Sequence, residues 1–157
     1  MTRPLPWLPV LALAACVIAA DRITKAAAAA RLVEGQSVPV LPGVLHLTLV
    51  LNTGGAFGLL RDARFFFIPF SLAAIACIIY YLIRYRPVGR MMTAAFGLIT
   101  GGAIGNLIDR LRYGYVIDFL DLRVWPVFNL ADSAITAGAA LLIIAVMTRG
   151  SERTSQG

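Results

Sequence analysis

Four aspartates gather in one region of a chain that otherwise carries little charge. Asp109, Asp118, Asp121 and Asp132 make up half of the eight acidic residues in 157. The segments around them are strongly apolar, and an ionisable side chain beside lipid is costly enough to indicate a function. Two carboxyls held close together in a poorly solvated place cannot both ionise, so they share one proton. Such a pair can activate a water and polarise a carbonyl, which is the chemistry of an aspartic protease.

Asp118 and Asp132 are the best candidates for this pair. Asp118 is the odd carboxyl on the apolar face of an alternating stretch, residues 115–124, where loss of solvation favours its protonated form. Asp132 lies near the start of an apolar segment, and the intervening residues are enough for the chain to double back. Asp121 lies two residues from Arg123 on the opposite face, which indicates a solvated or salt-bridged group. Asn129 and Asp132 would alternatively form an ordinary helix cap.

The segment before Asp118 has a helical pattern with small residues on one face. Glycines recur at four-residue intervals from Gly97 to Gly105, a spacing that lets membrane helices pack backbone to backbone. The pattern predicts that Asn106, Asp109 and Arg110 lie at the outer end of this helix. Asn106 could be an interhelical hydrogen-bonding group, and Asp109 and Arg110 are expected on different faces as ion-pairing groups.

The composition predicts an integral membrane protein. Hydrophobic residues make up 59% of the chain and charged residues 14%, whereas roughly 45 to 50% of a soluble domain is apolar. Four stretches approach the length of about 20 residues that crosses a bilayer. They are residues 5–28, 65–83, 91–108 and 128–148. We therefore expect a single domain, residues 1–157, with a membrane all-α core of four transmembrane helices and both termini on the same side.

The distribution of arginines predicts the orientation. Residues 84–90 contain three arginines within the hinge between the second and third spans, and Arg3, Arg149 and Arg153 lie on the same side. This density of cationic residues favours a cytoplasmic hinge and cytoplasmic termini. The net charge of +6 suits an anionic inner leaflet, with membrane lipid as a partner. No basic run or basic helix face points to nucleic acid.

Two further features belong to the outer side. Asp21 and Lys25 are four residues apart near the end of the first helix, and they form either a simple stabilising pair or a brace for the polar site. Residues 44–51 alternate in hydropathy and predict a short strand, which leads into a glycine-rich turn from Asn52 to Gly58. We expect these strands to form a small extracytoplasmic β-sheet segment at the outer face. The single histidine, His46, gives no metal site, and we expect neither a metal nor a cofactor.

These residues together resemble the bacterial lipoprotein signal peptidases, also called signal peptidase II. The resemblance rests on five motifs that occur in order from the first helix to the fourth. They are Asp21-x-x-Thr-Lys25, Asn52-Thr-Gly54, Gly102-Ala-x-Gly-Asn106-x-x-Asp109-Arg110, Val116-x-Asp118-Phe119 and Phe128-Asn129-x-Ala-Asp132. The resemblance implies an inner-membrane aspartic endopeptidase that cleaves the signal peptide from diacylglyceryl-modified prolipoproteins. Its active site would lie near the periplasmic face.

The resemblance also implies roles for individual residues. Asp118 and Asp132 would be catalytic, and a larger set would bind substrate or support the pair: Asn52, Gly54, Asn106, Arg110, Asn129, Asp21, Lys25 and Asp109. Globomycin-type cyclic peptides would inhibit the enzyme, which we expect to be a monomer. Residues 36–64 are a candidate cover for the site.

Two other functional classes compete with a protease. Paired intramembrane aspartates also serve proton relays in small proton-coupled transporters, but here the polar residues cluster at one edge of the membrane, and neither an internal repeat nor interrupted helices are visible. A non-enzymatic membrane scaffold would use the same aspartates as interface caps. Replacing Asp118 or Asp132 by Asn separates these hypotheses, because only the protease would lose cleavage while still inserting.

Overall fold

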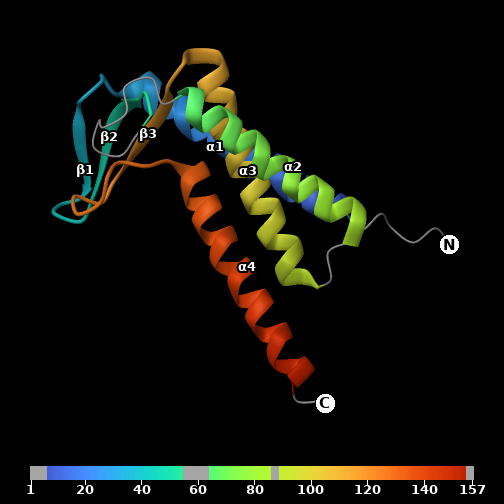
Figure 1. The fold of residues 1–157 in the computed structure, drawn as a ribbon. Coiled ribbons are helices and arrows are strands. Elements are labelled where there is room, and N and C mark those ends of the chain that lie inside the picture. Colours follow the sequence, from blue (N-terminus) through green and yellow to red (C-terminus); the bar gives the residue numbers. More distant parts are fainter. Residues whose placement is uncertain (1–6, 55–63, 86–88, 155–157) are drawn as a thin grey trace.

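Helices dominate the structure, and a small sheet lies at one end of them. The computed structural model describes residues 7–54, 64–85 and 89–154, with side-chain environments given for residues 7–54, 67–85 and 89–148. The elements in chain order are α1 (Leu8–Arg31), β1 (Ser37–Leu41), β2 (Leu45–Asn52), α2 (Arg64–Tyr85), α3 (Arg90–Tyr113), β3 (Val116–Asp121) and α4 (Leu130–Thr154). The strands gather where α1 and α3 end and α4 begins (Figure 1).

Helix α3 is the centre of the bundle, since it packs against α1, α2 and α4. It continues to Tyr113, beyond the predicted end of the membrane span at residue 108, and Asn106, Asp109 and Arg110 are all helical, as predicted. Arg110 and Arg112 in the last turn suit the negative end of the helix dipole. The helix stops at Gly114, whose φ of 81° is the left-handed conformation that favours glycine, and its N–H donates to the Arg110 carbonyl.

The glycines predicted to lie at helix contacts do so. A Cβ on Gly101 would lie 2.7 Å from the Val17 side chain of α1, and one on Gly105 would lie 2.8 Å from Asp21 Oδ2. A Cβ on Gly102 would collide with the Ala131 carbonyl of α4. Helix α3 therefore approaches both neighbours closely because it lacks side chains at these positions.

In the described part of the chain, three helices are long and apolar enough to cross a membrane: Phe67–Tyr85, Arg90–Tyr113 and Leu130–Thr148. The predicted second, third and fourth spans correspond to them. The predicted first span, residues 5–28, is not confirmed by this criterion. Helix α1 is continuous and long, but it carries Asp21, Arg22 and Lys25 in its C-terminal half.

The sheet has the order β1-β2-β3 and is antiparallel throughout. Strand β2 confirms the strand predicted at residues 44–51. Strand β3 ends at Asp121, short of the predicted stretch 115–124, since Arg123 takes a left-handed φ of 66°. Strand β1 was not predicted, because Pro39 breaks its pattern, but proline is tolerated on an edge strand. Of the candidate cover, residues 36–64, residues 55–63 lie outside the described part.

Candidate active site

Asp118 projects from β3 into the space between the sheet and the helices, and only 2% of it is exposed. Its Oδ1 accepts a hydrogen bond of 2.6 Å from Asn129 Nδ2, and its Oδ2 accepts one of 2.9 Å from Asn52 Nδ2. In the register, Val50 lies opposite Asp118 and Asn52 opposite Val116. Cross-strand partners share a face, as do residues two apart in one strand. The strand pairing therefore brings the Asn52 amide to the Asp118 carboxyl.

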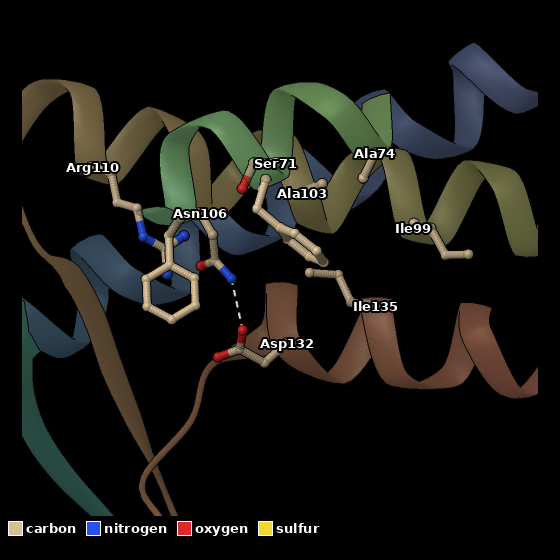
Figure 2. Close-up of a pocket in the computed structure, with 10 residues that line it drawn as sticks. Ser71, Ala74, Ile99, Ala103, Asn106, Arg110, Asp132 and Ile135 are labelled. Atoms are coloured by element: carbon tan, nitrogen blue, oxygen red, sulfur yellow. Dashed lines mark hydrogen bonds between the residues drawn. The ribbon is translucent and has the colours of Figure 1, made fainter. Parts of the chain in front are cut away.

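Asp132 lies in the first turn of α4, and two backbone-directed bonds fix that turn. The Asp132 N–H donates to Asn129 Oδ1 at 2.9 Å, and the Asn129 N–H donates to Asp132 Oδ2 at 3.3 Å. This reciprocal pattern is a capping box, so Asn129 is the N-cap and the helix begins at Leu130 rather than at the predicted residue 128. Asn106 Nδ2 donates to Asp132 Oδ1 at 2.7 Å (Figure 2). The cap hypothesis and the catalytic hypothesis are thus compatible.

The chain doubles back between the two aspartates, as the sequence predicts. Phe128 pairs with Leu120 of β3: the Phe128 N–H donates to the Leu120 carbonyl at 3.0 Å, and the Leu120 N–H donates to the Phe128 carbonyl at 2.8 Å. This pairing delivers the next residue, Asn129, directly beside Asp118. Asn129 is fully buried, and it bonds Asp118 through its amide N–H and Asp132 through its amide oxygen. A single residue therefore contacts both aspartates: its side chain bonds the Asp118 carboxyl, and its backbone N–H bonds the Asp132 carboxyl.

Asn106 is the second amide in this network, and its orientation is determined by its partners. Its Oδ1 accepts hydrogen bonds from Lys25 Nζ at 2.9 Å and from Asn129 Nδ2 at 3.1 Å. An ammonium group has no acceptor, so it must meet the oxygen end of the amide. The nitrogen end is then left to donate to Asp132. Lys25 consequently determines which end of Asn106 faces that aspartate.

A buried charge cluster lies behind the two asparagines. Lys25 Nζ is 3.0 Å from Asp21 Oδ2 and 2.8 Å from Asp109 Oδ2. The Arg22 guanidinium is 3.1 Å from Asp21 Oδ2 and 2.6 Å from Asp109 Oδ1. Two acids and two bases therefore neutralise each other, and only Arg22 is partly exposed. The Asp21–Lys25 pair predicted from the sequence is confirmed, and it braces the polar site through Asn106.

The same cluster holds the two elements that carry the candidate catalytic residues. Asp21 Oδ1 accepts a hydrogen bond from the Ala131 N–H at the start of α4, at 3.2 Å. Asp109 Oδ2 accepts one from the Ile117 N–H of β3, at 3.3 Å. Each of these donors is the immediate neighbour in sequence of Asp132 or Asp118. The cluster therefore positions the backbone on which both carboxyls stand.

A cavity of about 220 Å³ opens beside Asp132, between α2, α3 and α4 (Figure 2). Its polar end carries Asp132, Asn106 and Arg110. The remaining lining residues are Phe67, Phe70, Ser71, Ala74, Ile99, Ala103 and Ile135. The Arg110 guanidinium lies 4.8 Å from the centre of the Phe67 ring, a cation–π contact. Among the described residues no close ion pair of Arg110 is found, although the charges of Asp132, Asp118 and Asp109 act on its guanidinium.

The environment of Asp118 favours its protonated form. Burial is the largest cause, and together with the charge of Asp132 it raises the pKa of Asp118 from 3.8 to about 6, against the lowering effects of the Asn52 and Asn129 hydrogen bonds and of Lys25. Since the charge of Asp132 contributes to this rise, the value describes loss of the last proton from the pair. Asp118 therefore favours its protonated form below about pH 6.

Asp121 has a different environment. The Thr48 hydroxyl donates to Asp121 Oδ2 at 2.7 Å, and Arg123 Nη1 lies 3.1 Å from the same oxygen. The Thr48 hydrogen bond is the main reason that the pKa of Asp121 lies below its usual value. The salt bridge predicted with Arg123 is confirmed, although Asp121 is buried rather than solvated. Asp121 is accordingly an ionised structural group.

The structure brings together most of the residues predicted for the site. Gly54, the remaining one, is buried with a φ of 130°, and its N–H donates to Asn52 Oδ1 at 3.0 Å, which orients the amide that reaches Asp118. Sequence reasoning missed Arg22, whose position beside Asp21 gives no sign of the contact with Asp109. Among the described residues, no cluster of three or more His, Cys, Asp or Glu side chains could hold a metal ion.

Comparison with known proteins identifies the family. A family model described as signal peptidase (SPase) II matches residues 13–148. The chain belongs to the signal peptidase II family. Membership makes it a membrane endopeptidase, and the family model covers every residue of the network described above.

Relatives of the family resemble the chain over most of its length. A lipoprotein signal peptidase of Halothermothrix orenii is 48% identical over 128 residues, covering 82% of this chain and 88% of the relative. One from Paraburkholderia phymatum is 47% identical over 152 residues, covering 92% of this chain and 89% of the relative. A bacterial membrane enzyme solved by the in meso method at 2.3 Å superposes with a TM-score of 0.84 at 33% identity, covering 91% of this chain and 90% of that one.

Proposed function

We propose that this signal peptidase II family member removes signal peptides from lipoproteins by aspartic catalysis, with Asp118 and Asp132 as the catalytic pair. The observation that carries the proposal is the position of Asn129. Its amide donates 2.6 Å to one carboxyl and accepts 2.9 Å from the backbone of the other. The Asn129 backbone N–H also donates to the Asp132 carboxyl, and the charge of Asp132 raises the pKa of Asp118. Two poorly solvated carboxyls that are coupled in this way share a proton.

In this mechanism the shared proton resides on Asp118, whose pKa is raised, and Asp132 is the general base beside the cavity. Asp132 takes a proton from a water as that water attacks the scissile carbonyl, while Asp118 donates its proton to the carbonyl oxygen. When the tetrahedral intermediate collapses, Asp132 gives its proton to the leaving amine and Asp118 recovers its own from the hydroxyl. The pair then returns to its starting state with one proton.

The other residues position this pair and the substrate. Asn106, Asn129 and Asn52 hold the carboxyl oxygens by N–H donors, and Lys25, Asp21 and Asp109 hold the asparagines and the backbone. The cavity combines an apolar wall with a polar end. It suits an apolar signal sequence whose scissile carbonyl lies at Asp132, and Arg110 is available to the substrate backbone there.

The proposed setting is the bacterial inner membrane, with diacylglyceryl-modified prolipoproteins as substrates. All four helices cross the bilayer, and α1 does so because its charged outer half is neutralised inside the protein. The chain is one domain with cytoplasmic termini, and the sheet lies on the periplasmic side. The end of α2, the start of α3 and the end of α4 lie away from the sheet, which supports this arrangement (Figure 1).

The test is cleavage of a diacylglyceryl-modified prolipoprotein by purified protein. Asp118→Asn and Asp132→Asn should each abolish cleavage without impairing insertion or lowering thermal stability. Asp121→Asn is the matched control, because it makes the same change on the same strand outside the pair and should leave cleavage intact. A proton carrier or a scaffold would not cleave the peptide at all. Retained cleavage in both variants would refute the aspartic mechanism.

A further inference from the structure

The free end of the sheet exposes large apolar side chains that no part of the described structure covers. On the β3 side these are Leu122, Val124 and Trp125, which are 37%, 90% and 67% exposed. On the side of the β1–β2 turn they are Leu41 and Val44, 56% and 59% exposed. We refer to these five residues as the sheet tip. Contiguous exposed apolar side chains of this size indicate an interaction surface.

Strand pairing places the two halves of the sheet tip side by side. His46 lies opposite Asp121, so the turn that precedes β2 and the segment that follows β3 emerge at the same end of the sheet. The β1–β2 turn and the chain entering α4 run next to each other, lateral to the first turn of α4 (Figure 1). The sheet tip thus lies beside the outer ends of the membrane helices rather than above them.

The local geometry presents these side chains outward. Asp121 binds the Arg123 N–H at 2.8 Å and its guanidinium at 3.1 Å, and this clamp accompanies the left-handed φ of 66° at Arg123. A left-handed arginine is uncommon and costs about 1 to 3 kcal/mol. Val124 and Trp125 follow this turn, outside β3, and are largely exposed. Thr48 holds the clamp to β2.

The chemistry of the sheet tip matches a bilayer interface. Tryptophan concentrates at the level of the lipid headgroups, where its ring is apolar and its N–H remains wet. The Arg123 side chain is 51% exposed and supplies a cation at the same place for lipid phosphates. The neighbouring surface of the helices is already in lipid, so the bilayer is continuous with the sheet tip.

We propose that the sheet tip inserts into the outer leaflet of the membrane at headgroup level and anchors the sheet to the lipid surface. The anchor acts on the strand that carries Asp118, since Leu122 follows directly from β3. It therefore holds the sheet at a fixed height over the bilayer. The proposal depends on the embedding of the helices, not on the catalytic mechanism, and its test does not use cleavage.

The chain contains two tryptophans, Trp7 and Trp125, so Trp7→Phe leaves Trp125 as the only fluorescent indole. This variant, reconstituted in phosphatidylcholine–phosphatidylglycerol vesicles, should be quenched more by lipids brominated near the glycerol than by lipids brominated near the chain ends. It should be quenched poorly by aqueous acrylamide. A thermal unfolding transition like that of the wild type establishes that the variant is folded, and it is expected because Trp7 lies at the far end of α1.

A matched probe is Glu34→Trp in the Trp7→Phe/Trp125→Phe background. Glu34 is exposed at the opposite end of the sheet, where Gly35 pairs with Leu49, so this indole should be open to acrylamide and weakly quenched by either lipid. Free access of acrylamide to Trp125 without lipid quenching would overturn the proposal. Protection of Trp125 from both acrylamide and brominated lipid would also overturn the proposal, because a protein partner would then cover the sheet tip. Equal lipid quenching of Trp125 and of the indole at position 34 would show that the sheet tip is not a specific anchor.

Discussion

Replacing Lys25 tests whether the buried charge network supports activity as well as the stability of the fold. It is 1% exposed and contacts Asp21, Asp109 and the amide oxygen of Asn106 within 3.0 Å. Lys25→Met keeps the length and apolar stem of the side chain but removes the charge. One carboxylate then lacks its counter-ion, which for a buried pair costs about 3 to 5 kcal/mol. Total stabilities are about 5 to 15 kcal/mol, so thermal unfolding should move to a much lower temperature.

A second loss is expected in activity, because Lys25 also orients Asn106. A hydrogen bond to a charged group contributes about 1.5 to 3 kcal/mol. If that energy holds Asn106 Nδ2 against Asp132, kcat/KM should fall about ten- to a hundredfold in Lys25→Met at a temperature where the protein is folded. Cleavage of a diacylglyceryl-modified prolipoprotein, alongside thermal unfolding in the same detergent, measures both effects.

Two companion variants separate these effects. Asp109→Asn leaves one positive charge in excess but keeps the contact between Lys25 and Asn106, so stability should fall more than activity. The double variant Lys25→Met/Asp109→Asn has Asp21 and Arg22 as a balanced pair, so stability should recover while activity stays low. If the double variant recovers both, then Lys25 serves charge balance alone, and the argument about the orientation of the amide is wrong.

Three further predictions follow from the site and its supports. Cleavage should decline as the pH rises through about 6, because the pair loses its last proton. The free energy of unfolding should fall by roughly 3 kcal/mol between about pH 4 and pH 6 in the wild type but not in Asp118→Asn, because in that window an unfolded Asp has ionised while the folded Asp118 keeps its proton. Gly101→Ala and Gly102→Ala should both destabilise the protein, whereas only Gly102→Ala, which pushes on α4, should lower kcat beyond that effect. Asp121→Asn should release the turn at Arg123 and increase proteolysis there without abolishing cleavage.

Much of the fold is encoded in local patterns. Apolar length predicts helices α2, α3 and α4, and alternation predicts β2 and β3, because each of these signals depends on residues close in sequence. The edge strand β1 was missed since Pro39 and a short, exposed segment give no alternation. The start of α4 was placed at residue 128 instead of 130, because hydropathy does not distinguish a capping residue from a helical one.

The site was predictable in its members but not in its connections. Asp118 stands out as a carboxyl on an apolar strand face, and Asp132 as an acid at the start of an apolar helix. The contact of Arg22 with Asp109 joins α1 to α3, and no local pattern contains it. Arg110 was expected in an ion pair, yet its guanidinium packs on Phe67, a residue of another helix. Long-range partners of charged groups depend on helix packing, which a single sequence does not specify.

Charge balance in the described residues gives an independent reason for a single proton on the proposed catalytic pair. The basic groups around the site are Arg22, Lys25 and Arg110, and the acidic groups outside the pair are Asp21 and Asp109. Three positive charges and two negative charges leave room for one more anion. A pair with one proton supplies that anion and makes the site neutral, whereas two ionised aspartates would leave a net negative charge next to lipid. The positive charge of Arg110 therefore stabilises the ionised member of the pair. Removing that charge by Arg110→Met should make the pair hold its last proton more tightly, so the decline in cleavage should move to higher pH.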